Sequence, residues 1–241
     1  MPEMTSAEQQ TGISMNLISR LAGIFHSPKR VFSDIDAGTP WWQPFVCVSL
    51  LNMIVAYIVI PIQIQLFRLR ADQMPKEQFE ESLRHMQTFP IKYLGIIAVP
   101  VMVLIMGLIF AAASYIAVSV LSEKASFKKH LTIYFYASIV ASIGILVSTL
   151  VVLGKGVENI RTVRDAAAPF GPAAFVPEAQ KILYAVLSTL DVFSLWFYAL
   201  IALGVMQVFR LSWRSALLVV IPIWLLSVLG ALIGTRLGGP I

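Results

Sequence analysis

The chain has 241 residues, of which 58% are hydrophobic and only 13% charged, with a net charge of +5. A soluble domain is charged at about a quarter of its residues, so this composition excludes an ordinary soluble globular domain. The basic residues lie in short segments beside apolar runs, where they suit anionic headgroups and topology control, so nucleic acid is not expected as a partner. The composition predicts an all-α, polytopic membrane protein.

The N-terminal segment is expected to lie at the membrane surface. Residues 1–13 are polar and are predicted to be disordered. Residues 14–26 predict an amphipathic helix that is too short and too polar to span, with its apolar positions on one face. Those positions are Leu17, Ile18, Leu21, Ile24 and Phe25. Ser27 and Pro28 read as the cap and first position of a second short helix, so the interfacial region is placed at 14–40.

The remainder, residues 41–241, is predicted to be a bundle of five transmembrane helices. Several apolar runs reach the ~20 residues that a crossing requires. Trp41 and Trp42 mark the first membrane boundary, and Pro61 and Pro100 predict kinks in the first and second spans. The predicted spans are about 43–67, 91–121, 130–153, 181–209 and 215–235.

The segments between the spans predict how the chain crosses. Residues 68–90 are charged and predict a surface helix beginning at Pro75, whereas the prolines in 154–180 predict a loop. Basic residues in the short turns 122–129 and 210–214 and beside the N-terminal helices favour a cytoplasmic N-terminus. The expected location is therefore a bacterial inner membrane, with the N-terminus in the cytoplasm.

A polar stripe in the fourth span is the main candidate for an intramembrane site. It centres on Asp191, and a carboxylate in a bilayer costs roughly 2.5–3.5 kcal/mol on insertion scales. The stripe comprises Tyr184, Ser188, Asp191, Ser194 and Tyr198, and the third span offers a facing set of Tyr134, Ser138 and Ser142. The functional interpretation is a proton or ion path or a polar lipid site. The structural one, which a lone carboxylate favours, is hydrogen bonding between helices or Asp191 capping a helix break.

Small residues predict close packing between helices. The fifth span ends in the ladder Gly230, Gly234 and Gly238, and the second span carries Gly107 and Ala111 on one face. Packing within the bundle is favoured over a seam between two copies of the chain.

No residue pattern indicates catalysis. Cys47 is the single cysteine, and His26, His85 and His130 do not have the spacing of a metal site. No phosphate-binding loop, nucleophile elbow or zinc-protease motif occurs. The sequence therefore predicts no catalytic residue, no metal, no cofactor and no enzyme.

Three blocks in order resemble the Yip domain family of membrane proteins, named for interaction with Ypt/Rab GTPases and widespread in bacteria. They are residues 24–28 with Phe32, Ile35 and 41–44; residues 126–129 leading into 134–137; and residues 190–196 with Gly204. The resemblance covers residues 20–235. It implies five membrane helices, a cytosolic N-terminus and a non-enzymatic protein whose eukaryotic relatives are linked to vesicle trafficking.

The Asp-Leu-Tyr-Gly-Pro core of the eukaryotic N-terminal motif is not present, so the resemblance does not carry Rab-type GTPase binding over to this chain. The short amphipathic N-terminus suits a bacterial member. The leading hypothesis is a scaffold that organises lipids or partner proteins, including a second copy of itself. The competing hypothesis is a small transporter or permeation subunit that uses the stripe around Asp191.

Overall fold

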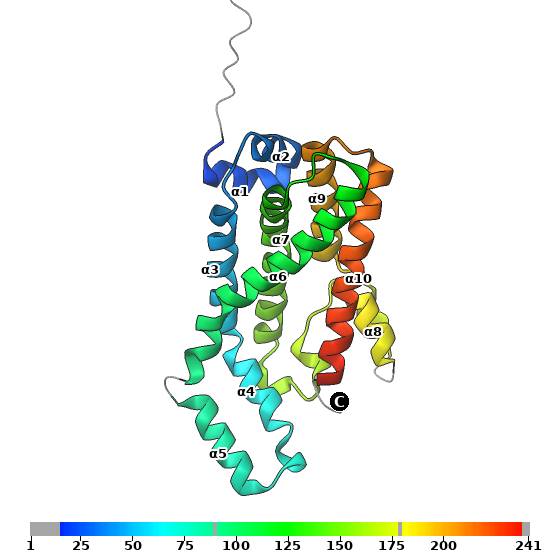
Figure 1. Ribbon diagram of the computed structural model, residues 1–241. Helices are drawn as coiled ribbons and strands as arrows, with labels where there is room; N and C mark the ends of the chain where they lie inside the picture. Colours follow the sequence, from blue (N-terminus) through cyan, green and yellow to red (C-terminus); the bar gives the residue numbers. More distant parts are fainter. Residues whose placement is uncertain (1–14, 89–90, 178–179, 238–241) are drawn as a thin grey trace, which may run out of the picture.

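The computed structural model describes residues 15–88, 91–177 and 180–237, which are helical and contain no strand (Figure 1). Residues 1–13 and Gly238, for which the sequence made predictions, lie outside this part. The α-helices are α1 (Leu17–His26), α2 (Pro28–Asp36), α3 (Trp42–Ile58), α4 (Ile60–Arg68), α5 (Lys76–Gln87), α6 (Ile91–Leu121), α7 (Phe127–Gly154), α8 (Lys181–Ser188), α9 (Val192–Phe209) and α10 (Trp213–Leu237). The 3-10 helices are η1 (Ala71–Gln73), η2 (Val157–Asn159), η3 (Arg164–Ala166) and η4 (Pro172–Phe175).

The long helices run between two ends of a bundle. The first two helices, α1 and α2, lie across one end and are called the platform below (Figure 1). The turns at 122–126 and 210–212 lie at this platform end, whereas α5, the loop after α7 and the described end of α10 lie at the opposite end. The segments that the sequence placed on one side of the membrane are thus together in space.

The centre of the bundle is α7, which packs against α3, α6 and α9. Its fully buried side chains include Ile133, Phe135 and Tyr136, and α9 adds Leu200 and Val205. Apolar surface remains exposed on the outer faces of α6 and α10, where a bilayer rather than water would cover it. This pattern is that of a membrane bundle packed around one central helix, α7, with its outer helices facing lipid.

Four described helices are long and apolar enough to cross a membrane, and the pair α3 and α4 makes a fifth if it is one span. These two helices are bent by 44° at Val59. Pro61 lies in the first turn of α4 and has no N–H to continue the hydrogen bonding of α3. The predicted all-α polytopic architecture is confirmed, and the first span is kinked next to the proline that predicted it.

The fourth span differs from its prediction. A single helix was expected over 181–209, but the chain forms α8 and α9 with a break at 189–191. The break moves Tyr184 and Ser188 onto a different helix from Ser194 and Tyr198. The continuous stripe along one helical face is therefore wrong.

The small residues behave differently in the two helices. A Cβ on Gly107 would lie 2.5 Å from Cζ of Phe135, and Ala111 is fully buried, so α6 approaches α7 closely here. Gly230 and Gly234 have no described atom near the position of a Cβ. The expectation that their ladder packs within the bundle is wrong for these two glycines, because α10 turns them outward.

Candidate functional site

Asp191 is the N-cap of α9. Its Oδ1 accepts hydrogen bonds from the N–H groups of Phe193 at 2.8 Å and Ser194 at 3.2 Å, and its Oδ2 accepts one from the Ser194 hydroxyl. The Val192 N–H donates to the carbonyl of Phe170 at 3.4 Å. These bonds satisfy N–H groups that a helix start leaves without partners. Asp191 therefore stabilises the helix break, which is one of the two structural interpretations of its sequence.

The break is also held by the neighbouring helix. Trp224 of α10 donates its indole N–H to the hydroxyl of Thr189 at 3.0 Å. Gly171, in the loop after α7, lies against the backbone of Asp191, where a Cβ would come within 2.8 Å of its Cα. Because α9 has 18 residues, about 27 Å, and α7 has 28 residues, about 42 Å, Asp191 lies on the side of the bundle away from the platform but short of its far end.

A cavity of about 250 Å³ brings much of the predicted polar set together. We call it the hydroxyl cavity. Its lining includes Tyr134 and Ser138 of α7, Ser188 of α8, and Ser194 and Tyr198 of α9. The two helical segments therefore do meet, as the sequence predicted. Asp191 is not part of the lining.

Two other predicted residues point elsewhere. The ring of Tyr184 lies 4.9 Å below the guanidinium of Arg164. Ser142 faces α3, where the side-chain amide of Asn52 donates to its hydroxyl at 2.7 Å. Both belong to contacts that hold elements together.

A second cavity, of about 470 Å³, lies between α3, α6 and α7 and has a mostly apolar lining. Asn52, Gln63 and Ser142 add polar groups to it, and Tyr134 and Ser138 line both cavities. The polar face of α7 is thus shared between two neighbouring hollows rather than directed into one path.

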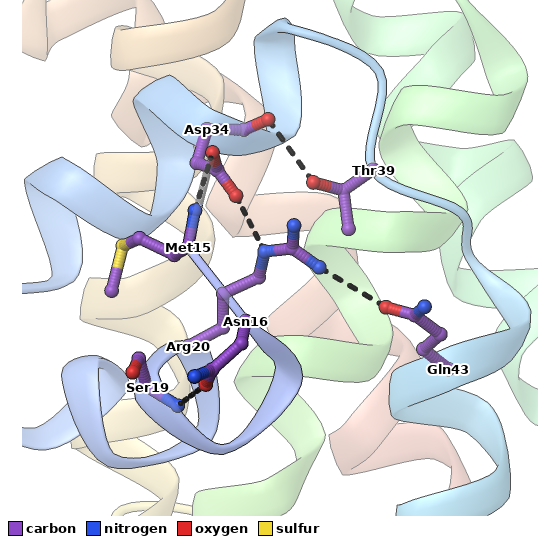
Figure 2. Close-up of polar contacts among 7 residues, drawn as sticks. All are labelled: Met15, Asn16, Ser19, Arg20, Asp34, Thr39 and Gln43. Carbon is purple, nitrogen blue, oxygen red and sulfur yellow. Dashed lines mark hydrogen bonds and ion pairs between the residues drawn. The ribbon is translucent and has the colours of Figure 1, made fainter. Parts of the chain in front are cut away.

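The platform is fixed by a buried ionic network that the sequence analysis missed. Figure 2 shows Arg20 between Asp34 and Gln43, with its Nε donating to Asp34 Oδ2 at 2.5 Å and its Nη1 to Gln43 Oε1 at 3.0 Å. The other oxygen of Asp34 accepts the Met15 N–H at 3.2 Å. Arg20 is only 8% exposed. The network ties α1, α2 and the start of α3 together.

The charge of Arg20 is secure despite this burial. Burial lowers the pKa of Arg20, but the side chains of Asp34 and Tyr136 outweigh it and the pKa is raised above its ordinary value. The Tyr136 hydroxyl is buried without a hydrogen-bond partner in the described part of the chain. The Asp34 carboxylate and the Tyr136 phenol of α7 both act on the cation, although only the carboxylate forms a hydrogen bond with it.

Below the network, the platform packs directly on the bundle. Phe32 is fully buried, and a Cβ on Gly204 of α9 would lie 3.2 Å from its ring and 2.5 Å from Ile133 of α7. Polar contacts at the edge add the ion pair of Lys129 with Asp36 at 2.5 Å and the Gln207 amide donating to Ser33 at 2.7 Å. The first two sequence blocks that carry the family resemblance meet Gly204 of the third block at this junction, whereas residues 190–196 of the third block lie at the other end of α9.

A signal for the network was present in the sequence. Arg20 precedes Gly23 and Ile24 by three and four residues, which places it on the same helical face as these two buried positions. The basic side chain therefore had to be buried with a partner or to turn away. Periodicity alone does not identify Asp34 or Gln43 as that partner.

The described residues contain no group of three or more histidine, cysteine or acidic side chains that could hold a metal ion. His130 is buried in α7, with Nδ1 2.7 Å from the hydroxyl of Ser114 and its ring stacked on Phe209 at 4.4 Å. It joins α6, α7 and α9, and it forms no ion pair with a carboxylate in the part of the chain that the structure describes.

Comparison with known proteins assigns the chain to a family and identifies a relative. A model of the Yip1 domain matches residues 22–234. The chain is 25% identical over 222 residues to membrane protein YknW of Bacillus subtilis (strain 168), a match that covers 89% of this chain and 90% of that protein. No solved structure matches. The family resemblance of the three blocks is confirmed: this chain is an integral membrane protein of the Yip1 domain family.

Proposed function

We propose that the protein is a non-enzymatic organiser of the bacterial inner membrane. Its bundle is a scaffold that presents the platform, at a cytoplasmic N-terminal end, to lipid or to a partner protein. The observation that carries this proposal is the buried Arg20–Asp34 pair, which holds the platform in one orientation on the bundle. A segment fixed in this way is suited to presenting a surface.

The outward side of the platform has the chemistry of a membrane-surface helix. Ile18 is 78% and Phe25 45% exposed on α1, seven residues and about two turns apart. Lys29 and Arg30 are exposed at the start of α2. Apolar side chains beside basic ones suit the headgroup region or an amphipathic partner helix.

Capture in membranes tests the proposal. A photocrosslinker at exposed Ala22, followed by purification in mild detergent, is expected to yield a defined protein or lipid adduct. Ile18→Asp with Phe25→Asp should abolish the adduct while the bundle stays folded. Phe175→Asp is the matched control, because this residue is 90% exposed at the other end of the bundle. An adduct that survives the platform variant and disappears in the control would refute the proposal.

The hydroxyl cavity supports a second candidate, a permeation subunit. Its lining hydroxyls could replace water around a small polar solute. The position of Asp191 as a helix cap argues against a carboxylate relay through it. Flux into proteoliposomes distinguishes the two functions, because only a permeation subunit would lose flux when Ser138→Leu fills the cavity.

A further inference from the structure

The loop after α7 is an ordered structure at the end of the bundle opposite the platform. We call residues 155–176 the loop cap. It contains three 3-10 helices and is held on three sides by hydrogen bonds. These bonds are Gln65 Nε2 to the Ile160 carbonyl at 3.2 Å, Ser148 Oγ to the Ala168 carbonyl at 3.3 Å, and the Val192 N–H to the Phe170 carbonyl at 3.4 Å.

The loop cap and the last turn of α7 enclose a cavity of about 530 Å³. This volume lies within the range of roughly 300–1,000 Å³ that is usual for small-molecule sites. Val151, Val152 and Phe170 give it apolar walls, and Lys155 and Arg164 add two cations. The cavity thus combines a hydrophobic wall with positive charge.

Arg164 is held in place by two contacts that leave most of its N–H donors available. Its guanidinium lies over the Tyr184 ring at 4.9 Å, and Nη2 donates to the Ala173 carbonyl at 3.2 Å. In the described ranges, neither Arg164 nor Lys155 forms an ion pair with a carboxylate. A guanidinium has five N–H donors in a rigid, planar arrangement that matches phosphate. Because Arg164 is already held by Tyr184 and Ala173, its side chain loses little conformational entropy when it binds a phosphate.

One carboxylate oxygen of the acidic residue in the lining is engaged in hydrogen bonds within its own turn. Oδ2 of Asp165 accepts the Arg161 N–H at 3.0 Å, the Thr162 N–H at 2.8 Å and the Thr162 hydroxyl at 3.1 Å. The hydrogen bond from the Arg161 N–H, followed by those from Thr162, lowers the pKa of Asp165, so this carboxylate is ionised. Its negative charge is partly compensated by the N–H and hydroxyl groups of its own turn. Glu158 folds over Gly156 and is not part of the lining.

The depth of the cavity matches that of a headgroup. The 28 residues of α7 extend about 42 Å, whereas the hydrocarbon core is about 30 Å thick. With the platform at one membrane surface, the far end of α7 reaches the headgroup region of the other leaflet. Lys155 follows directly after this end.

We propose that this cavity binds a phosphate group, supplied by a phospholipid headgroup or by free phosphate, through Arg164 and Lys155. The site lies at the other end of the bundle from the platform and does not depend on the proposed scaffold function. The apolar wall beside the cations favours a headgroup with its glycerol backbone attached.

Lipid titration by native mass spectrometry tests the site with the full purified chain. Phosphatidylglycerol and phosphatidylethanolamine should both bind, and diacylglycerol, which lacks phosphate, should not. Displacement of the bound lipid by millimolar inorganic phosphate would identify free phosphate as a ligand of the same site. No displacement would identify the headgroup as the source. Equal binding of diacylglycerol would overturn the proposal.

Charge-neutral variants locate the binding. Arg164→Gln should weaken phospholipid binding about tenfold, the loss expected for a charge-assisted hydrogen bond. Arg161→Gln is the matched control, because Arg161 is exposed on the same loop but outside the lining, and it should bind like the wild type. Lys155→Gln, at an exposed side chain that holds no described contact, decides the matter if Arg164→Gln does not fold. Unchanged affinity in Lys155→Gln, or an equal loss in Arg161→Gln, contradicts the site.

Discussion

Arg20 and Asp34 form the most buried of the ion pairs between described side chains, with exposures of 10% and 12%. Lys129 and Asp36, at the edge of the same junction, are 36% and 32% exposed. The nitrogen–oxygen distance is 2.5 Å in both pairs, so the two pairs differ in burial and not in length. At the scale of single residues, burial decides how much the loss of one partner costs, because water can replace an exposed partner and cannot reach a buried one.

Arg20→Met is therefore expected to weaken docking of the platform by about 3–5 kcal/mol, since it leaves Asp34 charged and unpaired. Lys129→Met should cost at most about 1 kcal/mol. Amide hydrogen exchange of residues 17–36 measures both. The double variant Arg20→Met with Asp34→Leu should recover part of the loss, and no recovery would show that the pair is not coupled.

The prediction for Asp191 is different, because a helix N-cap requires a hydrogen-bond acceptor and does not require a negative charge. Asp191→Asn should leave the thermal stability in detergent nearly unchanged, whereas Asp191→Ala should cost about 1 kcal/mol. Loss of solute flux in Asp191→Asn with an intact fold would favour the permeation function instead.

At the scale of helices, the close approach of α6 to α7 depends on Gly107. Gly107→Ala should destabilise the bundle by about 1–3 kcal/mol, because the added methyl meets the ring of the buried Phe135. Gly95→Ala on the same helix has open space and should be neutral or slightly stabilising. Thermal unfolding in detergent compares the two variants. Equal effects would mean that helix propensity, rather than packing, controls α6.

The elements themselves were largely predictable, and their partners were not. Apolar length identified the membrane helices, and Pro61 marked the bend between α3 and α4. The apolar run through 181–209 favoured one continuous helix, whereas Asp191, a residue type preferred at helix starts, was the local signal for the alternative of a capped break. Partners such as Arg20 and Asp34 lie on different helices, and periodicity within one helix cannot pair them.

At the scale of the whole molecule, the structure groups the platform with the turns after α6 and α9. A cysteine at Lys124 and one at Phe175, each in a Cys47→Ala background, should therefore react with impermeant reagents from opposite sides of the membrane. We expect Lys124 on the cytoplasmic side. Labelling of both from one side would contradict the topology, and the reverse assignment would invert the orientation while keeping the fold.

The docking of the platform on α9 has a consequence for biosynthesis. Ser33 and its partner Gln207 are 174 residues apart, so the ribosome adds the second roughly 10–35 seconds after the first at 5–20 residues per second. Throughout that interval Phe32 lacks the Gly204 surface that later covers it. The platform can bond to α3 and α7 before then, but its contacts with α9 are among the last of the bundle to form.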